Sequence, residues 1–336
     1  MNTAAAPDPV IAVNDLKVWF ANRDGIMRAV DGMSFTLLRG ETLGIVGESG
    51  CGKSVTAMTM LQLIPSPPSV VAGGSILYNG EDLLQFDEAR MRKIRGNEIS
   101  MIFQDPMTAL NPVLTIGEQI AETAVLHRKL HRRAARELAV EMLHKVKIPE
   151  PKRRADEYPH QFSGGMRQRA MIAAALVCNP KVLIADEPTT ALDVTIQGQI
   201  LDLIHDLVRE RSMALILISH DLGVIAQNAE RMMVMYGGSV VESGSTRRVF
   251  GHMAHPYTRG LFGARPRLGA PAGTRLTTID GTVPELVDLP TGCAFADRCG
   301  WAQPPCFTTR PPAEPVDTGH LASCLRLDAV LAQDAA

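Results

Sequence analysis

The sequence predicts an α/β fold with a largely parallel β-sheet that is covered by helices. Strand-like and helix-like segments alternate regularly between residues 163 and 236. A glycine-rich segment stands between a strand and a helix, and an apolar strand ends in two acidic residues. Such features are typical of the carboxyl edge of an open α/β sheet, where these folds bind their ligands.

In the first half, short runs of β-branched and aromatic residues predict strands, and periodic apolar positions predict helices. One helix is expected to begin near Lys53 and to stop before the prolines that start at Pro65. The expected strands are residues 11–20, 34–38, 42–46, 75–78 and 98–103, and the expected helices are residues 53–63, 115–126 and 132–147.

In the second half, a helix is expected to begin at Ser163, followed by alternating strands and helices. After Arg265 the chain becomes rich in proline and glycine. We therefore expect a main domain over residues 10–262 and a C-terminal extension over residues 263–336. The remaining expected strands are residues 182–185, 214–219 and 232–236, and the remaining helices are residues 195–210 and 222–229.

The composition of the 336 residues suits a globular protein, with 46% hydrophobic and 21% charged residues. The net charge of −2 gives no basic field, so nucleic acid is not an expected partner. No apolar run approaches the ~18 residues that a membrane span needs, and residues 1–9 lack the features of a signal peptide. The chain is therefore expected in the cytoplasm, where partner subunits would provide any membrane association.

Residues 47–54, Gly-Glu-Ser-Gly-Cys-Gly-Lys-Ser, match the phosphate-loop pattern G-x-x-x-x-G-K-[ST]. The pattern follows an expected strand and precedes an expected helix, which argues against a chance glycine-rich turn. Lys53 should reach the β- and γ-phosphates, and the Ser54 hydroxyl should bind Mg²⁺. Backbone N–H groups of the loop should surround the phosphates. The predicted nucleotide contacts in this loop are Gly47, Ser49, Gly50, Cys51, Gly52, Lys53 and Ser54.

An apolar strand at residues 182–185 runs directly into Asp186 and Glu187. A carboxylate at this edge of a parallel sheet is suited to hold Mg²⁺, which we expect of Asp186. Glu187 could polarise the attacking water. The pair could instead be surface acids that cap the following turn. The phosphate loop earlier in the chain favours the catalytic interpretation.

Residues 162–169, Phe-Ser-Gly-Gly-Met-Arg-Gln-Arg, form a second pattern suited to anions. Ser163 is a good N-cap, and Gly164 and Gly165 expose backbone N–H groups at a helix start. An ordinary helix N-cap preceded by a flexible segment would give the same sequence pattern. The segment resembles the signature motif of ATP-binding-cassette (ABC) ATPases. That resemblance implies nucleotide contacts by Ser163, Gly164, Gly165 and Gln168.

The remaining ABC motifs are present in the expected order, and the resemblance covers roughly residues 10–262. Gln104 is similar to the Q-loop glutamine, and Asp193 ends a D-loop-like Ala-Leu-Asp. His220 is similar to the switch histidine, which implies contact with the γ-phosphate. Phe20 fits the aromatic residue that stacks on adenine, and Trp19 is the less favoured candidate.

The resemblance implies a cassette with a RecA-like core, an antiparallel β layer and a helical subdomain at about residues 105–165. Two cassettes would meet head to tail, so that each ATP lies between the phosphate loop of one and residues 163–165 of the other. Glu187 would activate water, and Ser54, Gln104 and Asp186 would bind Mg²⁺. The implied cofactors are thus ATP and Mg²⁺.

Two further segments resemble the ATP-binding subunits of dipeptide and oligopeptide importers, residues 103–112 and the His-Pro-Tyr-Thr at 255–258. Nickel and glutathione importers belong to the same group, and no residue here is expected to recognise a peptide. The implied partners are a second, paralogous ATPase subunit, two transmembrane permeases and an extracytoplasmic substrate-binding protein. The implied location is peripheral, on the cytoplasmic face of the inner membrane. A soluble ATPase without membrane partners is the competing class.

Five basic residues follow one predicted helix and continue into the start of the next. This run could face lipid headgroups or a transmembrane subunit, or it could be a solvated helix face, and the sequence leaves both open. The five are Arg128, Lys129, Arg132, Arg133 and Arg136.

Four of the six cysteines lie in the C-terminal extension, at Cys293, Cys299, Cys306 and Cys324. The cytosol disfavours disulfides, and structural zinc favours C-x₂₋₄-C pairs, which are missing here. A four-thiolate iron–sulfur cluster accepts varied spacing, and free thiols are the simplest alternative. The segment resembles the extension of peptide-importer ATPases, some of which carry a [4Fe–4S] cluster there. That resemblance favours a cluster with a structural or redox-sensing role, and Cys51 and Cys178 are expected to be packing residues, although Cys51 could react with thiol reagents.

Overall fold

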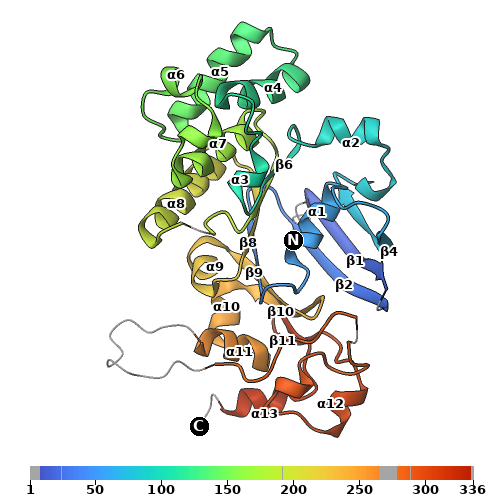
Figure 1. Ribbon diagram of the computed structural model, residues 1–336. Helices are drawn as coiled ribbons and strands as arrows, with labels where there is room; N and C mark the ends of the chain where they lie inside the picture. The colour runs from blue at the N-terminus through green and yellow to red at the C-terminus, as the bar shows by residue number, and fades with distance from the viewer. Residues whose placement is uncertain (1–7, 24, 191, 265–277, 288, 334–336) are drawn as a thin grey trace, which may run out of the picture. The chain divides into compact units, whose positions relative to one another are not determined.

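The computed structural model describes residues 8–23, 25–190, 192–264, 278–287 and 289–333. These residues form two compact units, each composed of separate stretches of the chain. Figure 1 labels the helices and strands along the chain. The first unit comprises residues 1–11, 36–42 and 77–218, and the second comprises residues 12–35, 43–76 and 219–336, both with the gaps just given. The position at Arg265, where the texture of the sequence changes, lies outside the described residues.

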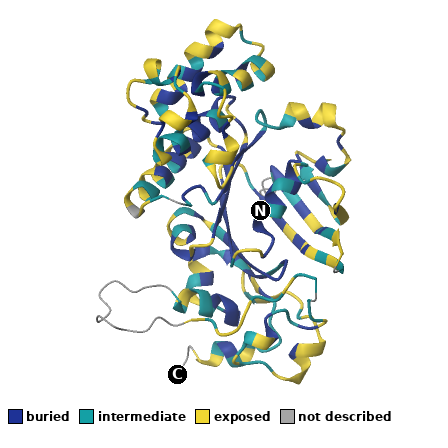
Figure 2. Ribbon diagram, viewed as in Figure 1, coloured by how far each residue is buried: buried dark blue, intermediate teal, exposed yellow. Residues whose placement is uncertain are grey.

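The first unit contains three of the predicted strands, which pair in parallel and are buried throughout. β7 (Val182–Asp186) lies between β6 (Ile99–Ile102) and β8 (Ala214–Ser219), and both pairings are parallel. Every residue of β7 is buried, as expected for a strand covered on both faces (Figure 2). The strand therefore delivers its last residue, Asp186, to the carboxyl edge of the sheet.

Helices form most of the remainder of the first unit, including the predicted helical region near residues 105–165. α4 (Ile116–Arg128) begins with a capping box between Thr115 and Glu118, which fixes its start. α7 (Gly164–Leu176) begins directly after Ser163, as predicted. The other helices of this unit are α2 (Glu88–Ile94), α3 (Pro106–Ala109), α5 (Arg132–Lys145), α6 (Pro151–Arg154) and α8 (Val194–Glu210).

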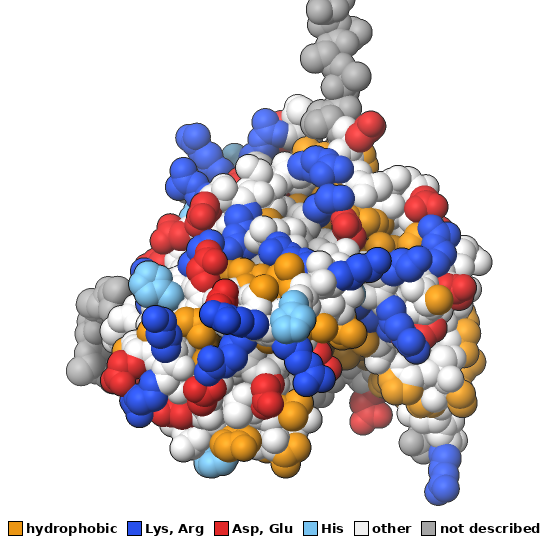
Figure 3. All heavy atoms as spheres, turned by 90° about the horizontal axis from the view of Figure 1, so that it is seen from above, with side chains coloured by type: hydrophobic (Ala, Val, Ile, Leu, Met, Phe, Trp, Pro, Cys, Tyr) orange, Lys and Arg blue, Asp and Glu red, His pale blue; other side chains and the backbone are white. Residues whose placement is uncertain are grey.

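The predicted basic run lies at the end of α4 and the start of α5, and two of its arginines form ion pairs with nearby acidic residues. Arg133 bonds to Glu137 at 3.2 Å and Arg136 to Asp156 at 2.6 Å, all of them exposed. Figure 3, which views the molecule from above, shows Lys and Arg side chains intermixed with acidic ones. This mixture is typical of a solvated helix face, the second of the two interpretations.

The second unit holds the phosphate-loop segment. Its β1 (Ile11–Asn22), β2 (Gly25–Leu37) and β4 (Ser69–Tyr78) lie in one sheet in the order β2-β1-β4. β3 (Thr42–Val46) pairs in parallel with β9 (Arg231–Tyr236) and leads into α1 (Lys53–Met60). α9 (Leu222–Asn228) packs near β3, because Ile225 approaches Gly44 closely.

The C-terminal extension is more regular than the sequence predicts. β10 (Ser239–Ser245) pairs with β9, β12 (His320–Ala322) pairs with β10, and β11 (Glu314–Asp317) pairs with β12, all antiparallel. The sequence conceals β11 and β12 because their four and three residues are too few to show a period. The remaining helices of this unit are α10 (Thr246–Gly251), α11 (Pro256–Gly263), α12 (Pro304–Thr308) and α13 (Leu327–Ala332).

Some element ends also differ from prediction. β2 begins at Gly25 rather than at residue 34, and β4 begins at Ser69 rather than at residue 75. α1 ends at Met60, and Gln62, whose φ is 48°, turns the chain away soon after. Within the described residues, no helix is both long and apolar enough to cross a membrane.

Candidate nucleotide site

The predicted site residues fall into two groups, one in each unit. The second unit carries the phosphate loop together with Phe20 and His220. The first unit carries the remaining predicted contacts, namely Gln104, Ser163, Gly164, Gly165, Gln168, Asp186, Glu187 and Asp193.

The phosphate loop is packed so closely that glycine is required at two positions. A Cβ at Gly52, whose φ is 100°, would lie 2.1 Å from the backbone oxygen of Ala29. A Cβ at Gly47 would lie 2.3 Å from the backbone oxygen of Met235. The loop is therefore held between the backbones of β2 and β9, while Ser49 and Gly50 are exposed. An exposed loop of backbone N–H groups at a helix start is suited to phosphate.

Lys53 is buried at the start of α1. Its ammonium donates hydrogen bonds to the carbonyl oxygens of Gly47 at 2.8 Å and Glu48 at 3.0 Å. The loop thus holds the cation that a phosphate would need, and Ser54 follows it in the first helical turn. Cys51 is 1% exposed, and burial raises the pKa of its thiol, so reaction with thiol reagents is disfavoured.

In the first unit, Glu187 is fixed by its neighbours. Its backbone N–H donates to the oxygen of Ile218 at 3.0 Å, and its φ of 45° turns it away from β7. Its carboxylate accepts hydrogen bonds from Gln104 Nε2 at 3.0 Å and from the Thr190 hydroxyl at 2.9 Å. Asp186, by contrast, is 3% exposed. Sequence reasoning missed Thr190; a hydroxyl three residues after the acid was the available signal.

The start of α7 is open to an incoming group. The Ser163 hydroxyl accepts a hydrogen bond from the Met166 N–H at 3.3 Å and caps the helix. Ser163 and Gly164 are exposed. Gln168, one turn later, is only 1% exposed, and its Nε2 has no hydrogen-bond partner within the described part of the chain. This burial lends no support to nucleotide contact by Gln168.

The other predicted contacts have simpler surroundings. Asp193 is exposed and caps α8 by accepting a hydrogen bond from the Ile196 N–H at 2.9 Å, while Ala191 of the same motif lies outside the described residues. His220 is exposed directly after β8, and Phe20 is half-buried near the end of β1. Trp19, the alternative aromatic, lies under the Arg28 guanidinium at 5.5 Å.

The four cysteines of the extension line one small cavity of about 20 Å³, together with His255 and Phe295. All are free thiols, and the Cys293 N–H donates to the Cys306 oxygen at 2.8 Å. Burial raises the pKa of Cys293, Cys299 and Cys324, the last to about 11. No group of three or more His, Cys, Asp or Glu side chains in the described part of the chain is arranged to hold a metal ion. The structure thus brings the thiols together without confirming a cluster.

The sequence matches two family profiles. Residues 30–190 match "ABC transporter", and residues 241–306 match "Oligopeptide/dipeptide transporter, C-terminal region". The dipeptide transport ATP-binding protein DppD of Bacillus subtilis is 49% identical over 333 residues, 98% of this chain and 99% of its own. The oligopeptide transport ATP-binding protein OppD of Salmonella typhimurium is 49% identical over 324 residues, 96% of both chains.

Solved structures show the same fold. A dimeric, post-hydrolysis ATP-binding cassette, MJ0796 bound to ADP and Pi, gives a TM-score of 0.64 at 27% identity, covering 70% of this chain and 99% of its own. CbiO1 of Clostridium perfringens, part of an ABC transporter complex, gives 0.61 at 26% identity, covering 73% and 92%.

Proposed function

The chain belongs to the family of ABC transporter ATP-binding proteins, and we propose that it is the subunit that hydrolyses ATP to power an importer of dipeptides or oligopeptides. One observation carries this proposal. The likeness to peptide-transport proteins extends over almost the whole chain, including the C-terminal region, rather than over the cassette alone. The solved cassettes, by contrast, cover only 70% and 73% of this chain.

The predicted site residues would supply the groups that ATP hydrolysis needs. The phosphate loop and Lys53 would bind the phosphates, and His220 would contact the γ-phosphate. Glu187, already oriented by Gln104 and Thr190, would accept a proton from the attacking water. Ser54, Gln104 and Asp186 would hold Mg²⁺, which neutralises phosphate charge when bound. The donor set fits a hard cation, since it contains only oxygen ligands.

We also propose that the chain works in a head-to-tail dimer with a paralogous cassette. The start of α7 supports this, because Ser163 and Gly164 are exposed at a helix N-terminus, which is suited to bind an anion. In the dimer these residues and Gly165 would contact the ATP held by the partner. The dimeric state of the MJ0796 cassette gives independent support.

The likeness to peptide-transport ATP-binding proteins supports a place in a membrane transporter. We propose two permease subunits, a substrate-binding protein outside the membrane, and a peripheral position on the cytoplasmic face. Within the chain we propose a cassette at residues 10–262, with its helical part at about 105–165, and an extension at 263–336.

For the extension we propose a [4Fe–4S] cluster held by Cys293, Cys299, Cys306 and Cys324. Its support is that all four thiols line one cavity. Each cysteine of a cluster binds a different iron, so the thiolates need not converge on one point as they must around a single ion. The cavity is small, so the thiols would move apart to admit the cluster. Iron and acid-labile sulfide near four each per chain, after anaerobic purification, would support this; zinc or no metal would contradict it.

The transport proposal is tested with the complete complex in lipid nanodiscs. The chain should co-purify with polytopic permeases, and ATP hydrolysis should rise when peptide-loaded binding protein is added. Nickel and glutathione, offered to the same complex, should not replace the peptide. A chain that purifies alone and hydrolyses ATP at an unchanged rate would instead be a soluble ATPase.

A further inference from the structure

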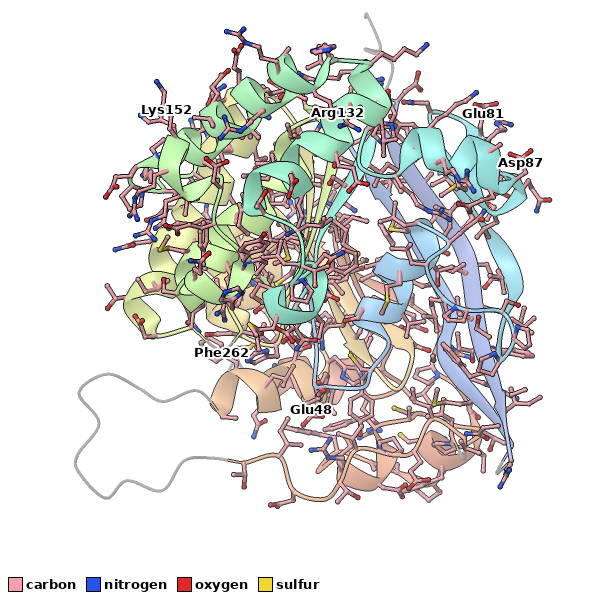
Figure 4. The ribbon with its side chains drawn as sticks, turned by 45° about the horizontal axis from the view of Figure 1, so that its top comes forward. Glu48, Glu81, Asp87, Arg132, Lys152 and Phe262 are labelled. Carbon is pink, nitrogen blue, oxygen red and sulfur yellow. The ribbon has the colours of Figure 1, made fainter. Side chains whose placement is uncertain are left out.

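The extension reaches the phosphate loop through one ion pair. Arg298 Nη1 donates to Glu48 Oε2 at 2.8 Å, and Arg298 Nη2 donates to Glu48 Oε1 at 3.3 Å. Glu48 is the second residue of the phosphate loop, 250 residues away in the sequence. Figure 4 labels Glu48 on the loop before α1, beside the C-terminal segment. A two-pronged arginine–carboxylate pair fixes geometry as well as charge.

Arg298 is itself held rigidly. Its side chain is 6% exposed, and its remaining hydrogen bonds go to the Tyr236 hydroxyl and to the backbone oxygens of Ile279 and Asp280. Burial opposes its charge, but the hydrogen bonds to Glu48 and Tyr236 raise the pKa of Arg298 overall. An arginine with all three nitrogens engaged cannot follow a mobile loop, so it sets the position of Glu48.

A second contact supports the same stretch of the loop. The Glu48 N–H donates to the Tyr257 hydroxyl at 2.8 Å, and Tyr257 is fully buried. Phe295, in the cysteine-bearing segment, lies 5.5 Å from the Tyr257 ring and 5.2 Å from the Tyr236 ring. The extension therefore packs on Tyr257, which bonds to the Glu48 backbone, and on Tyr236, which bonds to Arg298.

We propose that Arg298 is a positioning residue of the ATP site, which fixes the phosphate loop through Glu48 and so makes ATP affinity depend on the cysteine-bearing extension. This inference rests on the proposed ATPase function. The ion pair has two effects. It holds the backbone that would bind the phosphates, and it neutralises a carboxylate that would otherwise repel them.

The expected kinetic signature follows from where the loop acts. The loop would contact the phosphates in the ground state and in the transition state alike. A less rigid loop should therefore weaken the binding of the two states equally. Such a change raises KM and leaves kcat unchanged. We therefore expect Arg298→Ala to raise the KM for ATP about tenfold in the complete transporter, with kcat within about twofold. Arg298→Lys keeps the charge but cannot form both hydrogen bonds to the Glu48 carboxylate, so it should raise the KM by less, about threefold.

Two further variants separate positioning from general loosening of the extension. Arg310, in the same extension, bonds to Asp31 and Ser239 and not to the phosphate loop. Arg310→Ala should therefore leave the KM at the wild-type value. Adding Glu48→Gln to Arg298→Ala should not raise the KM further, because the two substitutions remove the same ion pair.

The proposal is overturned if Arg298→Ala leaves KM unchanged, if Arg310→Ala raises it equally, or if the Arg298 and Glu48 effects add. Failure of the proposed function is a separate outcome, because it would appear in the wild-type complex as hydrolysis that peptide-loaded binding protein does not stimulate. Fluorescent ATP-analogue binding to the full-length chain provides the matching Kd, which should rise by the same factor as KM.

Discussion

The Gln104 side chain donates a hydrogen bond from Nε2 to Glu187 Oε2 at 3.0 Å, across 83 residues of sequence. The Thr190 hydroxyl donates to the same oxygen at 2.9 Å. These two donors fix one oxygen of the carboxylate. A carboxylate oriented in this way needs little reorganisation to accept a proton from water, which is an advantage for a general base.

Glu187→Gln should abolish most ATP hydrolysis while leaving ATP binding intact. The amide keeps the size of the side chain but cannot accept a proton, so kcat should fall by about 10²–10⁴. Steady-state hydrolysis by the assembled transporter and equilibrium binding of ATP check the two parts. Near-normal hydrolysis by this variant would remove Glu187 from its assigned role.

Thr190→Val should lower kcat by roughly tenfold at an unchanged KM, because it removes one of the two donors that orient Glu187. Thr190→Ser keeps the hydroxyl and serves as the matched control, with kcat close to wild type. If the valine and serine variants behave alike, the hydrogen bond to Glu187 has no part in catalysis.

Local motifs made part of the site predictable from the sequence. The phosphate loop and the acidic pair each occupy consecutive residues next to a recognisable strand, so the backbone alone places them. Tyr257 and Arg298 were not predictable as neighbours of Glu48, because 209 and 250 residues separate them from it. Only the folded chain shows such contacts.

The secondary structure, too, was predictable where it depends on local sequence and was missed where it depends on distant contacts. Long or strongly apolar elements, such as β7 and α8, were predicted within one residue at each end. β12 was missed because it has three residues, and its strand character comes from pairing with β10 rather than from its own composition.

Lys53→Ala should weaken ATP binding by at least about tenfold, because it removes a buried cation placed for phosphate. The fold should persist, since α1 remains and Gly47 and Gly52 still pack against the backbones of Met235 and Ala29. Nucleotide titration measures the first effect and thermal unfolding the second. Unaltered ATP affinity would show that Lys53 serves only to satisfy the Gly47 and Glu48 carbonyls.

Glu242 should be among the most stabilising polar residues of the second unit. It is 1% exposed and accepts hydrogen bonds from the backbone N–H groups of Ala254 and His255 and from His320 Nε2. Glu242→Ala leaves three buried donors without an acceptor, so we expect a loss of about 3–5 kcal/mol in the free energy of unfolding. Urea denaturation measures it, and Glu137→Ala, which breaks an exposed pair, should barely move the midpoint.

His255 should make the stability of the second unit sensitive to mild acid. Burial lowers the pKa of His255 to about 4, although Glu242 opposes this shift, and the ordinary value is 6.5. Below pH 6.5 the unfolded chain therefore binds a proton that the folded chain does not. The stabilisation is complete above that value and is lost as the pH falls from about 6.5 to about 4.

Urea unfolding at pH 7.5 and pH 5 tests this directly, and the expected loss from His255 is about 2 kcal/mol over that interval. His255 caps α11 by accepting a hydrogen bond from the Tyr257 N–H at 3.1 Å. Asparagine is a good cap and does not titrate, so His255→Asn should keep the helix and reduce the pH dependence by that amount. His252→Asn, at an exposed position nearby, should retain the wild-type dependence. An equal pH dependence in His255→Asn and wild type would mean that another group takes up the proton on unfolding.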